Sequence, residues 1–255
     1  MTDLTEQPAE RPADAPDIAR DLAPTGVLRA SVNLGNPVLA QGTPDAPAGI
    51  TVDLAREIAR RLGLPVEFQC FDAARKSYEA MAAGRADLCF LAVEPAREAE
   101  VAFTAPYVHI EGVYAVPADS ELRTAADVDR AGVRVGVKQG SAYDLYLTRT
   151  LRAATVVRGA DGVDVFHAEG LEVAAGIRQP LTAHVAARPG LRLLDPAFMT
   201  IRQAVGTTRA RSARTVGFLR ETVTELTASG FVAASLTRSG QNPRLAAPVG
   251  EDATG

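Results

Sequence analysis

Residues 84–107 have the sequence GRADLCFLAVEPAREAEVAFTAPY, and this stretch decides the fold. Gly84 follows an alanine-rich segment and is the residue type that most readily ends a helix in the left-handed conformation. The run from Leu88 to Val93 is wholly apolar, which predicts a strand that is buried on both faces. Pro95 ends this strand, and Arg97 follows directly after it.

Arg97 is thus expected at the carboxyl end of a central strand. Ligands bind at that edge in open α/β sheets, and a guanidinium offers a planar fork of donors to a carboxylate or a phosphate. The residues alone also allow a second interpretation, a solvated arginine that pairs with Glu94, Glu98 or Glu100.

The segments before this stretch alternate between strand and helix patterns. Strands are predicted at 27–32 and 66–71, and helices at 51–62 and 74–83. The first helix has apolar residues at helical spacing and stops at Gly63. This β-α-β-α-β order predicts a mostly parallel sheet with helices on its faces.

A second series follows the long extended run at 108–116. The sequence predicts strands at 132–137, 163–166, 171–175, 192–194 and 201–206, and helices at 143–151, 180–187 and 214–229.

A glycine-serine turn, Gly140-Ser141-Ala142, joins the strand at 132–137 to the next helix. Free backbone N–H groups at such a helix start form an anion site. A plain strand-to-helix turn with a serine cap fits the same residues.

Composition excludes several classes of function. The chain has 255 residues, 47% of them hydrophobic and 23% charged, with a net charge of −4. These values suit a globular protein and give no general attraction to nucleic acid or anionic lipid. No apolar run is long enough to span a bilayer, so direct membrane insertion is not expected. Cys70 and Cys89 lie in apolar segments and are predicted to be free, buried thiols. No motif for a metal or a cofactor is present, and none is expected.

Both ends of the chain are polar. We predict a disordered tail at residues 1–24 and a loose tail at 241–255. The acidic, proline-rich start has no basic and apolar leader, so the chain as written is expected in the cytoplasm. If a leader has been removed, a periplasmic or extracellular location is expected instead.

Four segments together resemble the family 3 extracellular solute-binding proteins, which have the type II periplasmic amino-acid-binding fold. They occur in that family's order and are GITVDLAREIARRLGLPVEF (49–68), AMAAGRADLCFLAVEPAREAEVAFTAPYV (80–108), VRVGVKQGSAYDLYL (133–147) and FLRETVTELTASGFVAASL (218–236). The resemblance covers roughly residues 27–240.

The resemblance implies a two-lobed α/β fold, with each lobe a mostly parallel sheet flanked by helices. Residues 25–111 and 203–240 would form the first lobe, and residues 112–202 the second. Two hinge strands, near 108–116 and 199–205, would let the lobes close on a ligand. The resemblance also implies a monomer, a small-molecule ligand and an ABC-type permease as a partner.

Site residues carry over by position. The resemblance implies that Arg97 grips a ligand carboxylate and that the turn Gly140-Ser141-Ala142 donates backbone hydrogen bonds to the same group. The usual hydroxyl before the arginine is missing at Ala92, and Asn36 replaces the usual stacking aromatic. Ile177 or Arg178 stands where an aspartate would receive an α-ammonium group, and a cation there would repel it.

These departures predict a cleft that is more basic than an amino-acid site. Basic residues that could face it are Arg75, Lys76, Arg97 and Arg178; for Arg75 and Lys76 a surface charge is the favoured interpretation. The ligand-binding residues expected are Arg97, Ser141, Gly140, Ala142, Asn33, Asn36, Arg75, Ala92, Glu111, Arg178 and Gln179.

We therefore expect a binding protein for a small organic anion, amino-acid-like or a carboxylic acid, that need not carry a standard α-ammonium group. It would act as an importer component or a soluble sensor. Glu111, on the first hinge strand, could instead take an ammonium group and leave an amino-acid site with rearranged contacts. The alternative function is an enzyme that resembles the cyclohexadienyl dehydratases, with Glu111 or His109 as its acid or base.

Overall fold

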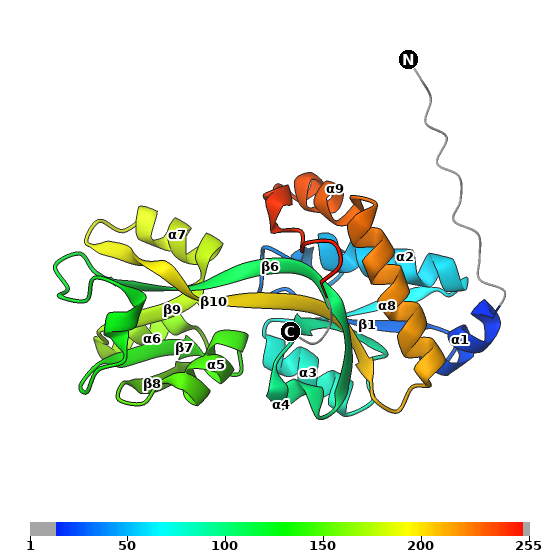
Figure 1. Ribbon diagram of the computed structural model, residues 1–255, viewed down its shortest axis with the longest axis horizontal. Coiled ribbons are helices and arrows are strands. Elements are labelled where there is room, and N and C mark those ends of the chain that lie inside the picture. Colours follow the sequence, from blue (N-terminus) through cyan, green and yellow to red (C-terminus); the bar gives the residue numbers. More distant parts are fainter. Residues whose placement is uncertain (1–13, 252–255) are drawn as a thin grey trace, which may run out of the picture.

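The structure is a computed structural model that describes residues 14–251. Two lobes are joined by two long strands, β6 (Val101–Pro117) and β10 (Leu191–Thr208), as Figure 1 shows. The first lobe contains α1 (Ala15–Leu22), β1 (Leu28–Asn33), β2 (Gln41–Thr43), β3 (Ala46–Ala48), α2 (Ile50–Leu62), β4 (Val66–Phe71), α3 (Ala74–Ala82), β5 (Leu88–Ala92), α4 (Pro95–Glu98), α8 (Ala213–Ala228), α9 (Phe231–Arg238) and the 3-10 turn η2 (Pro243–Leu245). The second lobe contains the 3-10 turn η1 (Ala125–Val128), β7 (Arg134–Lys138), α5 (Ala142–Thr150), β8 (Thr155–Gly159), α6 (Gly162–Glu169), β9 (Val173–Ile177) and α7 (Arg178–Ala186).

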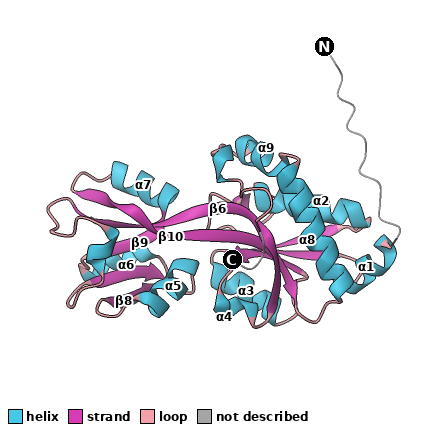
Figure 2. Ribbon diagram, in the orientation of Figure 1, coloured by secondary structure: helices cyan, strands magenta, loops and turns pink. Residues whose placement is uncertain are grey.

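One eight-stranded sheet runs through both lobes in the order β4-β1-β5-β10-β6-β9-β7-β8. The pairs within each lobe, β4-β1-β5 and β9-β7-β8, are parallel, whereas the pairs that involve β6 and β10 are antiparallel. Helices flank the sheet in both lobes (Figure 2). The predicted two-lobed α/β fold with two connecting strands is confirmed. The predicted lobe boundaries, 111/112 and 202/203, fall inside β6 and β10.

The stretch at 84–107 folds as its residues predict. Gly84 has a φ of +68° directly after helix α3. All five residues of β5 are buried, since this strand pairs with β1 on one side and β10 on the other. Pro95 then opens the short helix α4, which carries Arg97.

The predicted disorder of residues 1–24 is wrong for α1. Residues 1–13 lie outside the described residues, but the helix packs its apolar face, Ala15, Ile18, Ala19 and Leu22, against α2 and α8. The Asp21 carboxylate accepts hydrogen bonds from the Ser212 N–H (2.9 Å) and the Thr215 hydroxyl (2.6 Å) at the start of α8. The segment is polar overall, but its four apolar residues recur at helical spacing, which is typical of an amphipathic helix.

The predicted loose tail at 241–255 is also wrong as far as residue 251. The Ala247 N–H donates to the Tyr107 carbonyl at 3.0 Å. Glu251 then reaches both connecting strands: its carboxylate lies 2.8 Å from His109 Nε2 on β6 and 3.6 Å from Arg202 Nη1 on β10. The segment after α9 is therefore fastened along β6.

Two predictions in the second lobe need correction. Residues 163–166 belong to helix α6 rather than to a strand, because Asp161 caps the helix by accepting hydrogen bonds from the N–H groups of Val163 (2.8 Å) and Asp164 (3.4 Å). A run of four apolar residues fits either a buried strand or a buried helix. The edge strand β8 was not predicted.

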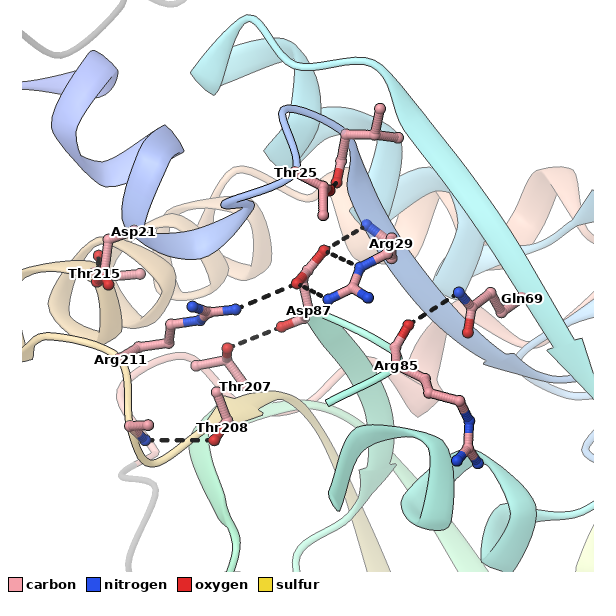
Figure 3. Close-up of polar contacts among 12 residues, drawn as sticks. Asp21, Thr25, Arg29, Gln69, Arg85, Asp87, Thr207, Thr208, Arg211 and Thr215 are labelled. Carbon is pink, nitrogen blue, oxygen red and sulfur yellow. Dashed lines mark hydrogen bonds and ion pairs between the residues drawn. The ribbon is translucent and has the colours of Figure 1, made fainter. Parts of the chain in front are cut away.

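Asp87, just before β5, holds three strands together at the end of the sheet away from the carboxyl edge (Figure 3). Its side chain has no exposed surface and accepts hydrogen bonds from the Arg29 side chain at 2.7 and 3.0 Å and from Arg211 at 3.2 Å. Its own carbonyl accepts from the Thr207 hydroxyl at 2.8 Å. One buried carboxylate thus pairs with two arginines and ties β1 and β10 to β5.

Asp87→Asn should destabilise the fold by about 3–5 kcal/mol, because it leaves two arginines without their buried counterion. Urea denaturation measures this free energy of unfolding. The exposed Asp119→Asn is the matched control and should change stability by less than about 0.5 kcal/mol. A loss below 1 kcal/mol in Asp87→Asn would contradict the assigned role.

Both cysteines are free, as predicted. Cys89 on β5 is fully buried, and this burial raises the pKa of its thiol to about 12. Burial also raises the pKa of Cys70, although that residue is only partly covered.

Iodoacetamide at pH 8 should therefore alkylate Cys70 in the folded protein and leave Cys89 unmodified, because the thiolate is the reactive form and only Cys70 is accessible. Peptide mass spectrometry before and after unfolding in urea checks this. Labelling of Cys89 at equal rates in both samples would show that β5 is not the protected core of the sheet.

Candidate functional site

A cavity of about 60 Å³ lies between the two lobes. First-lobe residues reach it from the carboxyl ends of β1 and β5 and from α3 and α4; second-lobe residues reach it from β7, β9 and the start of α5. The residues that line it are Asn33, Gly35, Asn36, Ala74, Phe90, Leu91, Ala92, Arg97, Lys138, Gln139, Ser141, Ala142, Tyr143, Ile177, Ile201 and Gln203. This is the sheet edge at which α/β proteins bind ligands.

Arg97 is the most buried charge of this lining, with 2% of its surface exposed. Its guanidinium donates to the Ala92 carbonyl of its own lobe at 3.0 Å and to the Gly140 carbonyl of the second lobe at 3.1 Å. Burial lowers the pKa of the Arg97 guanidinium, against the opposing effect of Glu94. The surface interpretation, with an ion pair to Glu94, Glu98 or Glu100, is wrong, since no carboxylate among residues 14–251 forms an ion pair with Arg97.

The start of α5 faces the cavity, but most of its predicted donors are already used. The Ser141 hydroxyl caps the helix and accepts from the Asp144 N–H at 3.0 Å. The Gly140 N–H donates to the Asp144 carboxylate at 2.8 Å, and the Ser141 N–H to the Lys138 carbonyl at 3.1 Å. Of the three predicted backbone donors, only the Ala142 N–H has no acceptor among the described residues.

Asn33 and Asn36 line the cavity as predicted. Each side-chain oxygen accepts a hydrogen bond from a nearby backbone N–H, from Gly35 at 3.0 Å and from Val38 at 3.2 Å. With the oxygens occupied in these turns, the two amide NH₂ groups remain as donors. Ala92 also lines the cavity and contributes its carbonyl to Arg97.

Five predicted residues do not line this cavity: Arg75, Glu111, Gly140, Arg178 and Gln179. Arg75 pairs with Glu79 on the surface of α3, so its surface interpretation is the better one. Arg178 pairs with both Glu111 and Asp195. The prediction of a basic cluster at the cavity is therefore wrong. Ile177, one residue before Arg178, lines the cavity instead.

The same ion pair occupies Glu111, which is thus not a free partner for a ligand ammonium group in this structure. His109 lies beside Glu251 of the C-terminal segment. Neither of the two candidate catalytic residues lines the cavity.

Three polar residues of the lining were missed: Lys138, Gln139 and Gln203. Lys138 ends β7 just before the glycine-serine turn, and a charge at the carboxyl end of a strand was a signal that could have found it. Gln203 on β10 lies opposite Ala92 of β5 and is 6% exposed. Its position is set by the pairing of two distant strands, which the sequence does not reveal.

The lobes meet through direct contacts around the cavity. Lys138 Nζ of the second lobe donates to the Asp72 carbonyl of the first at 2.8 Å. Gly35 permits this approach, because a Cβ at that position would lie 2.0 Å from the Asp72 carbonyl oxygen. Beside the cavity, the buried Glu94 pairs with Arg149 of α5 at 2.9 Å.

The lining has an unbalanced charge. It includes two cations, Arg97 and Lys138, and no aspartate, glutamate or histidine. No group of three or more potential metal ligands occurs among residues 14–251, and within that range no helix combines the length and apolar character that a membrane span needs.

Solved structures share this architecture at low sequence identity. The P235GK mutant of ArgBP from T. maritima is 20% identical, with a TM-score of 0.71 over 89% of this chain and 99% of that chain. A binding component of an ABC transporter from Wolinella succinogenes, complexed with lysine, is 16% identical, with a TM-score of 0.69 over 84% of this chain and 95% of that chain. An ancestral arginine-binding protein bound to glutamine is 18% identical, with a TM-score of 0.66 over 84% of this chain and 96% of that chain.

No curated protein sequence matches the chain. The two-lobed fold and the ordered segments agree with a family match that covers residues 31–240. The chain belongs to the bacterial extracellular solute-binding proteins, family 3.

Proposed function

We propose that this solute-binding protein captures a small organic anion that carries no α-ammonium group, as the binding component of an ABC-type importer or as a soluble sensor. The observation that carries the proposal is Arg97, a guanidinium with 2% exposure and no carboxylate partner among the described residues. A buried charge is costly unless it is paired, and a ligand anion in the cavity supplies the missing partner.

The rest of the lining supports an anion. The Ala142 N–H and the amide groups of Asn33 and Asn36 are donors of residues that line the same small space. The lining offers no carboxylate to pair with an ammonium group, and Ile177 places an apolar side chain where a partner for that group is expected. The lysine, arginine and glutamine bound by structural neighbours all carry such a group.

Ligand capture would proceed by bending of β6 and β10, the two strands that join the lobes. The Arg97 guanidinium already spans the lobes through the carbonyls of Ala92 and Gly140. An anion that takes the remaining Arg97 donors would bring charge-assisted hydrogen bonds to the point where the lobes meet. Closure and binding would thereby be coupled.

The proposal includes a monomer that hands its ligand to a permease. Among residues 14–251, Val249 is the large hydrophobic side chain that is exposed. Stable self-association usually needs a contiguous apolar patch, so the described surface favours a monomer.

Arg97→Ala should weaken the binding of a carboxylate ligand by about 2–5 kcal/mol, because the ligand charge would lose its buried partner. Arg97→Lys should retain only part of this binding free energy, since an ammonium group lacks the planar fork of donors. Calorimetry with the tightest carboxylate from a thermal-shift screen measures both. Arg75→Ala, a surface arginine on α3, is the control and should bind normally; equal affinity of Arg97→Ala and wild type would refute the role.

Deaminated acids should bind more tightly than the matching α-amino acids, by tenfold or more, which is about 1.4 kcal/mol. The reason is that the cavity lining has no carboxylate to pair with an ammonium group and has two cations that repel it. Titrations of glutamate against glutarate, and of alanine against propionate, test this. Tighter binding of the amino acids, lost in Glu111→Gln, would instead establish the rearranged amino-acid site.

A further inference from the structure

We infer that Lys138 is a second ligand-binding cation and that the substrate class is a short dicarboxylate, with one carboxylate on Arg97 and the other on Lys138. This inference rests on the proposed function, because it specifies the anion that the same cavity takes. It goes further because it adds Lys138 as a second cation and assigns the ligand two negative charges, which distinguishes dicarboxylates from monocarboxylates.

Lys138 reaches the cavity from the second lobe, as the last residue of β7. Its ammonium group has three donors, of which one serves the Asp72 carbonyl at 2.8 Å. No carboxylate among residues 14–251 forms an ion pair with Lys138; the nearby Asp72 carboxylate is occupied by Lys76 at 2.7 Å and is exposed. Lys138 therefore lines the cavity without an ion-pair partner among the described residues.

Charge balance sets the ligand's charge. Arg97 and Lys138 contribute two positive charges to a lining without an acid. A monoanion would pair with one of them and leave the other without an ionic partner in the lining. A dianion neutralises both. The inference therefore follows from the pair of cations, whereas Arg97 alone would be satisfied by any carboxylate.

The positions of the two cations favour a ligand with two separate anionic groups over a ligand with one doubly charged group. Arg97 comes from α4 of the first lobe and is anchored to the carbonyls of Ala92 and Gly140. Lys138 comes from the second lobe and is anchored to the Asp72 carbonyl, beside Gly35. Because the two cations are fixed to different backbone segments, a ligand with one carboxylate at each end matches them.

Size limits the chain between the carboxylates. The cavity of about 60 Å³ admits a small ligand. A short backbone, as in succinate or glutarate, suits that size. A larger hollow of about 290 Å³ shares Gly35, Lys138, Tyr143 and Ile177 with the cavity, so the Lys138 end is the one at which the site is open to a longer ligand.

The test compares matched pairs of acids on three proteins. Calorimetry would measure succinate against butyrate and glutarate against pentanoate for wild type, Lys138→Gln and Lys76→Gln. Lys138→Gln keeps a donor for the Asp72 carbonyl and removes the charge. Lys76→Gln removes a neighbouring surface lysine that does not line the cavity.

Wild type and Lys76→Gln should bind each dicarboxylate at least tenfold more tightly than its monocarboxylate. Lys138→Gln should reduce this ratio to less than threefold, because it should weaken dicarboxylate binding far more than monocarboxylate binding. Equal binding of both acids by wild type would overturn the inference and leave the anion-binding function standing. An equal loss of affinity for both acids in Lys138→Gln would also overturn the inference. That result is expected if Lys138 only helps the lobes to close.

Two further outcomes have definite meanings. Tighter binding of methylphosphonate than of either dicarboxylate would overturn the assignment of two separate anionic ends. Failure of all four carboxylates to bind wild type would refute the proposed function itself, and the inference with it.

Discussion

The arrangement of this protein depends on one buried guanidinium. Arg97 is withdrawn from water between two lobes, where it donates to a carbonyl of each and lacks an ionic partner among the described residues. Two neutral acceptors satisfy two of its five N–H groups and none of its charge. The position of Arg97 is fixed by the elements before it. The fully buried strand β5 is followed by a proline, which starts the short helix α4 that carries Arg97.

The opposite end of the same sheet shows how buried charge is handled when no ligand is involved. At Asp87, one carboxylate takes two arginines and a backbone N–H, all of them from the protein itself. That ionic cluster fixes strands, whereas at the other edge the proposed role of the unpaired Arg97 is to attract a ligand anion. Fold stabilisation and the proposed ligand recognition thus lie at opposite ends of β5.

Local chemistry explains which features the sequence could predict. The strand at β5, its proline stop and Arg97 follow from residues that are adjacent in the chain, so they could be placed in advance. The prediction that Arg178 faces the cleft is wrong because it depends on the residue at which strand β9 ends. The strand ends at Ile177, and the Ile177 side chain lines the cavity. Lys138 could have been found as a charge at the carboxyl end of a predicted strand, whereas Gln203 depends on how distant strands pair, which no local pattern encodes. The composition of both tails predicts no structure, but apolar contacts order α1, and a hydrogen bond and ion pairs order the C-terminal segment.

The C-terminal segment has a consequence for affinity. Through Glu251 it contacts both strands that connect the lobes, β6 at His109 and β10 at Arg202, and it contributes nothing to the lining of the cavity. Closure as proposed would bend those strands and strain these contacts. Part of the equilibrium between open and closed molecules would then be set far from the ligand. Since apparent affinity scales with the fraction of molecules that are competent to bind, natural variation in this segment can retune the protein while every ligand contact stays the same.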